Sequence, residues 1–288
     1  MSEGKKEILL GDCLELMKDI PNGSIDMILA DLPYGTTACK WDSIIPLEPL
    51  WKQYKRIIKD NGVIVLTASQ PFTTKLISSN YEMFKYEWIW NKVGGSNFMN
   101  LKNRPFKTQE NVLVFSKSAK FTFNPIRVYR TEKSLKRYKA GSIAIINSSG
   151  LYVEHYGVKK NTKAKLHEDG KKHPIDIITF SIHEKGRYKI KHPTKKPVAL
   201  FEYLIKTYTN ENDLVLDNTA GSGTTAIACL KTNRQFIVME KEQKYYDIIL
   251  KRVEDFNKNF EQNAKLRSEI KEFGYAKTEL NKINPTLF

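Results

Sequence analysis

The segment between residues 214 and 240 limits the possible folds of this chain more than any other stretch. Leu214–Asp217 and Phe236–Glu240 are apolar runs of the kind that form buried strands, and a glycine loop that opens a helix lies between them. Gly221 and Gly223 have no Cβ, so the backbone of this loop can approach a ligand closely. Strand, glycine loop, helix and strand in this order predict a parallel βαβ unit, and with it an α/β fold.

The same unit also indicates a ligand. Ala226 occupies the last position of the glycine fingerprint, where alanine is allowed. Glu240 ends the second strand 23 residues after Asp217, and an acid about 20 residues further along commonly accepts hydrogen bonds from ribose hydroxyls. We therefore expect a nucleoside-bearing cofactor, either a dinucleotide such as NAD or S-adenosylmethionine. A tight turn beside a surface glutamate is the structural alternative.

A second candidate site follows the apolar run Ser24–Ala30, which is typical of a buried strand. Asp31 and the backbone carbonyls beside Pro33 offer hydrogen-bond acceptors, and Tyr34 offers a flat aromatic face. Two acceptors and a stacking surface suit a planar ring that carries an exocyclic amine, although a strand ending in a Pro-Tyr-Gly turn would show the same residues. Because parallel strands end at one edge of a sheet, we expect Asp31 and the glycine loop to converge.

Positive charge is concentrated in the middle of the chain. The net charge is +15, and residues 116–197 carry +14 of it, with 20 lysines and arginines against 6 acidic residues. This distribution predicts a basic, irregular insert at residues 116–190 that binds a polyanion such as duplex DNA; a solvated basic loop is the alternative. The candidate DNA-binding residues are Arg104, Lys107, Lys159, Lys160, Lys163 and Lys165.

The composition, 41% hydrophobic and 27% charged, is that of a globular protein. No run approaches the roughly 18 apolar residues that a membrane span needs. The N-terminus lacks the apolar core of a signal peptide. Cys13, Cys39 and Cys229 lie far apart, with neither metal-ligand nor disulfide spacing. We therefore expect a cytoplasmic protein without a metal site.

Hydrophobic periodicity predicts the remaining elements, and a polar and basic loop is expected at Gly94–Thr108. The expected strands are Ile8–Leu10, Val63–Leu66, Tyr86–Trp90, Asn111–Phe115 and Ile175–Ile182, and the expected helices are Leu14–Ile20, Pro46–Lys59, Thr73–Ser79, Val198–Tyr208 and Tyr245–Phe273.

Several of these motifs resemble those of amino-group DNA methyltransferases. Asp31–Tyr34 looks like their Asp-Pro-Pro-Tyr motif, with leucine at its second position. Asp217–Thr225 resembles their S-adenosylmethionine loop, and His192–Pro197 resembles the His-Pro-Thr-x-Lys-Pro stretch that precedes it. The catalytic motif comes before the cofactor loop, with the recognition region between them, which is the order of the β group.

Further stretches carry the same resemblance. Gly11–Cys13 and Gln109–Phe115 match the family, and Gly35–Thr37 with Lys40–Asp42 looks like a phage or phage-related adenine-modifying subset. The resemblance covers roughly residues 7–127 and 190–255.

The resemblance implies a Rossmann-like, S-adenosylmethionine-dependent methyltransferase sheet with helices on both faces, which modifies the N6 amine of adenine in duplex DNA. It assigns catalysis to Asp31, Pro33 and Tyr34. Asp31 and the carbonyl beside Pro33 would accept hydrogens from the amine, and Tyr34 would stack on a base flipped out of the duplex. The implied cofactor-binding residues are Asp12, Cys13, Thr194, Lys196, Asp217, Thr219, Gly221, Gly223, Thr224, Thr225 and Glu240.

The resemblance also divides the chain. It implies a catalytic half at residues 7–115, the basic target-recognition insert at 116–190, a cofactor-binding half at 191–255, and a C-terminal helix and tail at 256–288. A homodimer is a further possibility in this family.

Other interpretations stay open. Asp12 suits a helix N-cap, and Thr194 with Lys196 suits a loop-to-helix cap. Aspartate rather than serine at position 31 favours adenine by the family trend, but cytosine presents the same amine at N4. RNA and protein-amine methyltransferases carry a similar motif, usually after the cofactor loop. A DNA-binding protein with a non-functional cofactor pocket would not need intact Asp31, Tyr34 and Glu240.

Overall fold

The computed structural model describes residues 4–35, 42–96, 101–139, 170–182 and 195–273, the side chains of residues 96, 137–139 and 264–273 excepted. Two compact units make up the chain: the first comprises residues 1–124 and 176–288, and the second comprises Pro125–Ile175. The sequence-predicted site residues that lie outside the described residues are Lys159, Lys160, Lys163, Lys165 and Thr194, and Cys39 lies outside them as well.

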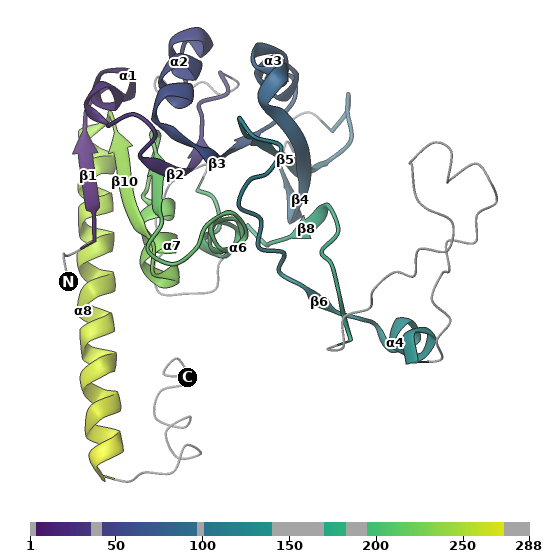
Figure 1. Cartoon of the computed structure of the whole chain (residues 1–288), viewed down its shortest axis with the longest axis vertical. Helices are drawn as coiled ribbons and strands as arrows, with labels where there is room; N and C mark the ends of the chain where they lie inside the picture. The colour runs from purple at the N-terminus through teal and green to yellow at the C-terminus, as the bar shows by residue number, and fades with distance from the viewer. Residues whose placement is uncertain (1–3, 36–41, 97–100, 140–169, 183–194, 274–288) are drawn as a thin grey trace. The chain divides into compact units, whose positions relative to one another are not determined.

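An eight-stranded sheet with the order β1-β10-β9-β2-β3-β5-β4-β8 forms the centre of the first unit (Figure 1). Neighbours from β1 to β3 are parallel, whereas β5 runs antiparallel to both β3 and β4. The parallel strands therefore end at one common edge. Their bounds are β1 (Lys6–Leu10), β2 (Ile25–Asp31), β3 (Ile58–Ala68), β4 (Phe84–Ser96), β5 (Lys107–Phe115), β8 (Ile177–Thr179), β9 (Leu214–Asp217) and β10 (Gln235–Glu240).

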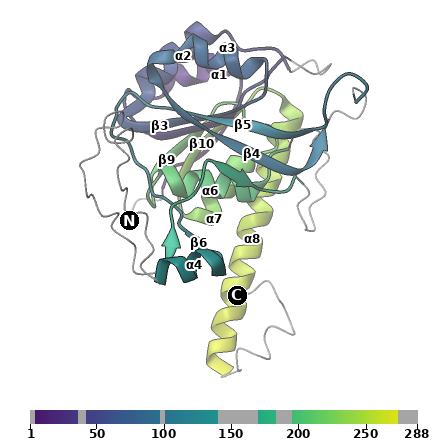
Figure 2. The same ribbon diagram turned by 90° about the vertical axis from the view of Figure 1, so that its right-hand side faces the viewer.

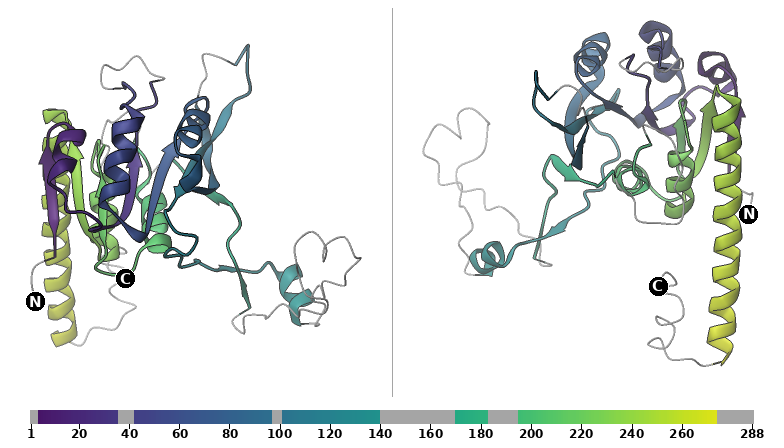
Figure 3. Two further views of the ribbon diagram at one scale, coloured as in Figure 1. Left: turned by 45° about the horizontal axis from the view of Figure 1, so that its top comes forward. Right: turned by 180° about the vertical axis from the view of Figure 1, so that it is seen from behind.

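Helices cover both faces of this sheet, as Figure 2 shows. One face carries α1, α2 and α3 with the 3-10 turns η1 and η2, and the other carries α6, α7 and α8. Seen from behind, α8 packs along β1 and β10 (Figure 3). The bounds are α1 (Cys13–Leu16), η1 (Met17–Asp19), α2 (Leu47–Ile57), α3 (Phe72–Ser79), η2 (Tyr81–Met83), α6 (Val198–Tyr208), α7 (Thr224–Thr232) and α8 (Gln243–Phe273).

Strand β2 shows why both faces need cover. Its side chains alternate, so that Ile28 and Ala30 pack under α1–α3 while Met27 and Leu29 pack against α6–α8, and all four are fully buried. A strand buried on both faces has a continuous apolar sequence, which is what residues 27–30 show. The predicted α/β fold with helices on both faces is confirmed.

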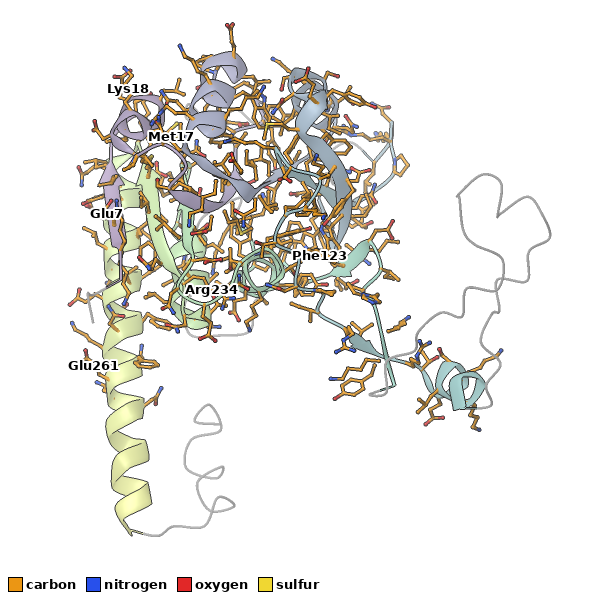
Figure 4. The ribbon with its side chains drawn as sticks, viewed as in Figure 1. Glu7, Met17, Lys18, Phe123, Arg234 and Glu261 are labelled. Atoms are coloured by element: carbon orange, nitrogen blue, oxygen red, sulfur yellow. The ribbon has the colours of Figure 1, made fainter. Side chains whose placement is uncertain are left out.

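The boundaries depart from the periodicity at several places. The helix predicted over Pro46–Lys59 ends at Ile57, because β3 begins at Ile58 and extends the strand predicted at Val63–Leu66. The loop predicted at Gly94–Thr108 is shorter, because β4 continues to Ser96 and pairs with Lys107 at the start of β5. Backbone pairing beyond the core needs no apolar side chains, so hydrophobicity does not report it. The helix predicted over Leu14–Ile20 is instead α1 followed by η1, in which Met17 is fully buried while Lys18 points away from the core (Figure 4). Strand β8 keeps only the centre of the strand predicted at Ile175–Ile182.

The second unit contains β6 (Val128–Tyr129), α4 (Glu132–Lys139) and β7 (Lys171–Lys172) among its described residues. Strands β6 and β7 pair antiparallel, and the Lys171 ammonium lies 4.8 Å from the centroid of the Tyr129 ring. Helix α4 was not among the predicted elements. Its residues are good helix formers, but too few of them are apolar to reveal a helix by hydrophobic periodicity.

None of the helices in the described part of the chain combines the length and the apolar composition that crossing a membrane requires.

Packing against α6 should dominate the stability of the first unit. Leu204 is fully buried in the core between α6 and the sheet, so Leu204→Ala removes buried methyl groups and leaves a cavity. We expect a loss of about 2–5 kcal/mol in the free energy of unfolding, measured by urea denaturation. Leu250 on α8 is 42% exposed, and Leu250→Ala as the control should cost about 0.5 kcal/mol. Equal losses in the two variants would contradict the assignment of this core.

Candidate active site

Four parallel strands deliver acidic or hydroxyl side chains to the carboxyl edge of the sheet. Asp31 ends β2, Asp217 ends β9 and Glu240 ends β10, while Thr67 on β3 is the register partner of Asp31. The chain leaves β2 toward β3 on one side and leaves β9 toward β10 on the other. Strand order therefore reverses between β9 and β2, which is where open α/β sheets bind ligands.

Three donors hold the carboxylate of Asp31. Its Oδ1 accepts hydrogen bonds from the Tyr34 hydroxyl at 2.8 Å and from the Thr67 hydroxyl. Its Oδ2 accepts from the Lys196 ammonium at 2.7 Å. The side chain of Asp31 remains 24% exposed, so it is oriented by the protein and still accessible.

Tyr34 presents an aromatic face beside this carboxylate. Its ring stacks on Phe72 with the centroids 5.4 Å apart and the planes 25° from parallel, and the Lys196 ammonium lies 5.5 Å from its centroid. Burial, with the nearby charges of Asp31 and Glu110, raises the pKa of the Tyr34 hydroxyl well above its ordinary value. At neutral pH this hydroxyl is therefore protonated and donates.

Lys196 connects the two predicted sites. Burial disfavours its charged form, but the carboxylates of Asp31 and Glu110 outweigh that cost and raise the pKa of the ammonium. The backbone carbonyl of Lys196 accepts from the Thr224 hydroxyl at 3.3 Å, at the start of α7. The residue predicted for cofactor binding thus places its ammonium on the predicted catalytic carboxylate.

The glycine loop has the backbone that its sequence predicts. Gly221 and Gly223 have φ of 53° and 78°, values that favour glycine. A Cβ on Gly223 would also come within 3.0 Å of the Ile249 side chain on α8, so packing requires glycine there as well. Glu240 accepts from the backbone N–H groups of Gly221 at 2.8 Å and Glu242 at 2.9 Å. Each carboxylate oxygen has a second lone pair, so Glu240 keeps acceptor capacity.

Asp217 is the most deeply buried acid of the site. It accepts from the Thr219 backbone N–H at 3.0 Å and from the Thr225 hydroxyl. Burial raises the pKa of Asp217 to about 7. The Thr219 hydroxyl in turn donates to the backbone carbonyl of Asp31 at 3.2 Å. The predicted convergence of the glycine loop on Asp31 is therefore confirmed.

Asp12 and Cys13, both predicted to bind the cofactor, make contacts with neighbouring residues. Oδ1 of Asp12 accepts from the Leu14 backbone N–H at 2.9 Å, so Asp12 is the N-cap of α1, as its alternative interpretation held. The Cys13 thiol accepts from Nδ2 of Asn218 at 3.4 Å, and burial raises the pKa of this thiol.

The two described DNA-binding candidates differ in environment. Arg104 is exposed, whereas Lys107 is half-buried, contacts the Ser69 hydroxyl and has its pKa lowered by burial.

Sequence reasoning missed Thr67 and Glu110 as site residues. Thr67 ends an apolar strand, and nothing in that strand marks its hydroxyl as functional. Glu110 lies inside the stretch Gln109–Phe115 that matches the family, but the sequence of this stretch does not indicate which residues Glu110 contacts.

Comparisons with known proteins agree with this geometry. A family profile described as DNA methylase (N6_N4_Mtase) matches residues 25–251. Type II methyltransferase M.HinfI of Haemophilus influenzae is 30% identical over 92% of this chain and 72% of its own length. Type II methyltransferase M1.MboII of Moraxella bovis is 30% identical over 81% of this chain and 91% of its own length. The crystal structure of an M1.HpyAVI–SAM complex is 26% identical with a TM-score of 0.56, covering 85% of this chain and 98% of that chain.

The raised pKa of Asp217 predicts a pH-dependent stability. Its folded-state pKa of about 7 lies above the ordinary 3.8, so its contribution to folding is complete below about pH 4 and is lost as the pH rises through 7. The side chain of Asp217→Asn cannot ionise. Between pH 5 and pH 8, the free energy of unfolding of this variant should therefore rise by about 2–3 kcal/mol relative to that of the parent protein. Urea denaturation at both pH values measures this, and parallel stability profiles would show that Asp217 titrates normally.

Proposed function

This chain belongs to the N6/N4 family of DNA methylases and is a DNA methyltransferase that uses S-adenosylmethionine; we propose that it methylates the N6 amine of adenine at specific sites in duplex DNA. Asp31–Tyr34 precedes Asp217–Thr225 along the chain, which supports placing it in the β group. The sequence of Gly35–Thr37 with Lys40–Asp42 supports a place close to the phage-like adenine-modifying members. The similarity to type II methyltransferases supports a role in restriction–modification.

The residues at the carboxyl edge fit this cofactor. Glu240 has acceptor capacity at the position where ribose hydroxyls bind, and the glycine turn brings backbone close to that carboxylate without a Cβ in the way. We assign ribose binding to Glu240 and the wall of the cofactor site to the loop from Asp217 to Thr225. When bound, S-adenosylmethionine supplies a methyl group on a positively charged sulfur.

One observation supports this function most directly: the carboxylate of Asp31 is oriented and remains 24% exposed, and its own backbone carbonyl contacts Thr219 of the glycine loop. In the proposed reaction, Asp31 and the carbonyl beside Pro33 accept the two amine hydrogens, which turns the nitrogen lone pair toward the methyl group. Tyr34 stacks on the flipped base. With the cofactor bound, the N–C bond would form as the S–C bond breaks, and the proton released by the amine would pass by way of the partly exposed Asp31 carboxylate to solvent. Positioning and electrostatics supply most of the acceleration.

Asp31 favours adenine over cytosine by the trend of the resembling family, and N4-cytosine methylation is the second candidate because that amine has the same hydrogens. We assign target recognition to the basic insert at residues 116–190, between a catalytic half at 7–115 and a cofactor-binding half at 191–255. The DNA-binding residues of this proposal are Arg104, Lys107, Lys159, Lys160, Lys163 and Lys165.

Incubation of unmethylated plasmid DNA with the protein and labelled cofactor tests the function. Digestion to nucleosides should yield N6-methyladenine, whereas N4-methylcytosine would select the second candidate. Asp31→Asn should lower the single-turnover rate by about a hundredfold or more, because it removes one acceptor of the amine, and should change cofactor affinity less than about threefold. Asp26→Asn, at the opposite end of β2, is the matched control and should stay active. An Asp31→Asn protein as fast as its parent would refute the catalytic assignment.

Neutralising the insert should weaken DNA binding alone. Replacing Lys159, Lys160, Lys163 and Lys165 with glutamine removes four charges, so the slope of log affinity against log salt should fall by about 3–4 if all four contact phosphates. Fluorescence anisotropy of labelled duplex over a salt series measures this, with cofactor affinity as the control. Equal loss of cofactor binding would place these lysines in the core of the enzyme.

A further inference from the structure

Four side chains of alternating charge form a line at the carboxyl edge of the sheet. Lys92 of β4 lies 3.2 Å from Oε1 of Glu110 on β5, Lys196 lies 3.5 Å from Oε2 of Glu110, and Lys196 lies 2.7 Å from Oδ2 of Asp31. The side chains of Lys92, Glu110 and Lys196 are only 5%, 15% and 8% exposed. Only Asp31, at the end of the line, is as much as 24% exposed.

Burying a charge costs desolvation free energy, so each charged side chain in this line depends on an oppositely charged neighbour to remain ionised. Lys196 sits between two carboxylates, and Glu110 sits between two ammonium groups. An apolar core of the same volume would stabilise the fold at least as well as such a line in many proteins. The line ends on the one carboxylate that faces the proposed amine site, which indicates a role in that site.

The contacts of Asp31 define that role. Thr67 and Tyr34 both donate to Oδ1, so Lys196 is the one donor to Oδ2 among the described hydrogen bonds. The orientation of the carboxylate plane therefore depends on where the Lys196 ammonium lies. The Thr224 hydroxyl donates to the backbone carbonyl of Lys196, and Oε2 of Glu110 forms an ion pair with the Lys196 ammonium at 3.5 Å.

We propose that Glu110 is a positioning residue for methyl transfer, which acts through Lys196 to hold the Asp31 carboxylate in the orientation that receives the target amine. This inference rests on the proposed function of Asp31. Glu110 itself makes no described contact with Asp31. Its negative charge is neutralised by Lys196 on one carboxylate oxygen and by Lys92 on the other.

The charges around Lys196 give the role a pH signature. Asp31 and Tyr34 face it from the end of β2, Glu110 and Lys107 from β5, and Lys92 lies behind Glu110 on β4. Without the Glu110 charge, Lys196 faces the like charges of Lys92 and Lys107 with one carboxylate fewer. Its pKa must then fall, so Oδ2 of Asp31 loses a charged donor at a lower pH than in the parent protein.

Single-turnover methylation by Glu110→Gln between pH 7 and pH 10 tests the proposal. We expect the rate constant to fall about tenfold to a hundredfold, with the affinities for duplex DNA and S-adenosylmethionine changed less than about threefold. The alkaline limb of the rate profile should move to lower pH. Glu110→Asp keeps the charge on a shorter side chain and should restore that limb while recovering only part of the rate.

A double variant separates charge from position. Lys92→Met with Glu110→Gln removes one positive and one negative charge, so the alkaline limb should return toward that of the parent while the rate stays low. Lys59→Met is the matched control, because Lys59 pairs with Asp26 at 2.6 Å at the other end of β2, and its rate and pH profile should equal those of the parent.

The possible outcomes are distinct. A Glu110→Gln protein with the parent's rate and pH profile would overturn the positioning role, as would a loss confined to DNA or cofactor affinity. If Glu110→Gln does not fold, the rate constant of Glu110→Asp decides, and a Glu110→Asp protein as fast as its parent overturns the role. Absence of methylated adenine with the parent protein, measured in parallel, would instead refute the proposed function.

Discussion

The parallel pairing of β2 with β9 is the interaction on which the site depends. Met27 and Ile28 of β2 are the register partners of Val215 and Leu216 of β9, although 188 residues separate each pair along the chain. This ladder places the end of β2 beside the glycine loop, where the Thr219 hydroxyl reaches the backbone of Asp31. Helices bury both faces of the pair, so a slip in register would move buried side chains to the wrong face.

Two acids at this edge have different environments. Asp217 is buried and satisfied by a backbone N–H and a hydroxyl, without an ammonium partner among its described hydrogen bonds, and its pKa rises to about 7. Asp31 is 24% exposed and accepts a hydrogen bond from the ammonium of Lys196. Burial and the presence or absence of an ammonium donor thus give two neighbouring acids different properties.

Much of the fold could be predicted from residue patterns. Val198–Tyr208 and Leu214–Asp217 have their predicted bounds, and the helix ending at Phe273 begins two residues earlier than expected. These segments have strong apolar periodicity, which burial on the sheet produces. The extensions of β4 and β5 and the short helix α4 could not be predicted, because backbone pairing and charge-rich helices leave little hydrophobic signal.

The candidate site, too, could be predicted only in part from the sequence. Asp31, Tyr34, Asp217 and Glu240 could be found from the sequence, since each follows an apolar strand and carries a functional group beside a turn. Contacts between strands could not be found, because they depend on strand order and register. Those contacts include the Thr67 hydroxyl on Asp31 and the line from Lys92 through Glu110 to Lys196.

The sequence by itself determined the chemical groups, the strand ends that carry them and the α/β class, because local periodicity and turn residues encode these properties. Only the tertiary structure decided that Lys196 lies against Asp31 and that Glu110 faces two lysines. The physical reason is that these ion pairs join different strands and loops, with Lys196 165 residues from Asp31 and Glu110 18 residues from Lys92, so they form only after the sheet has brought those segments together.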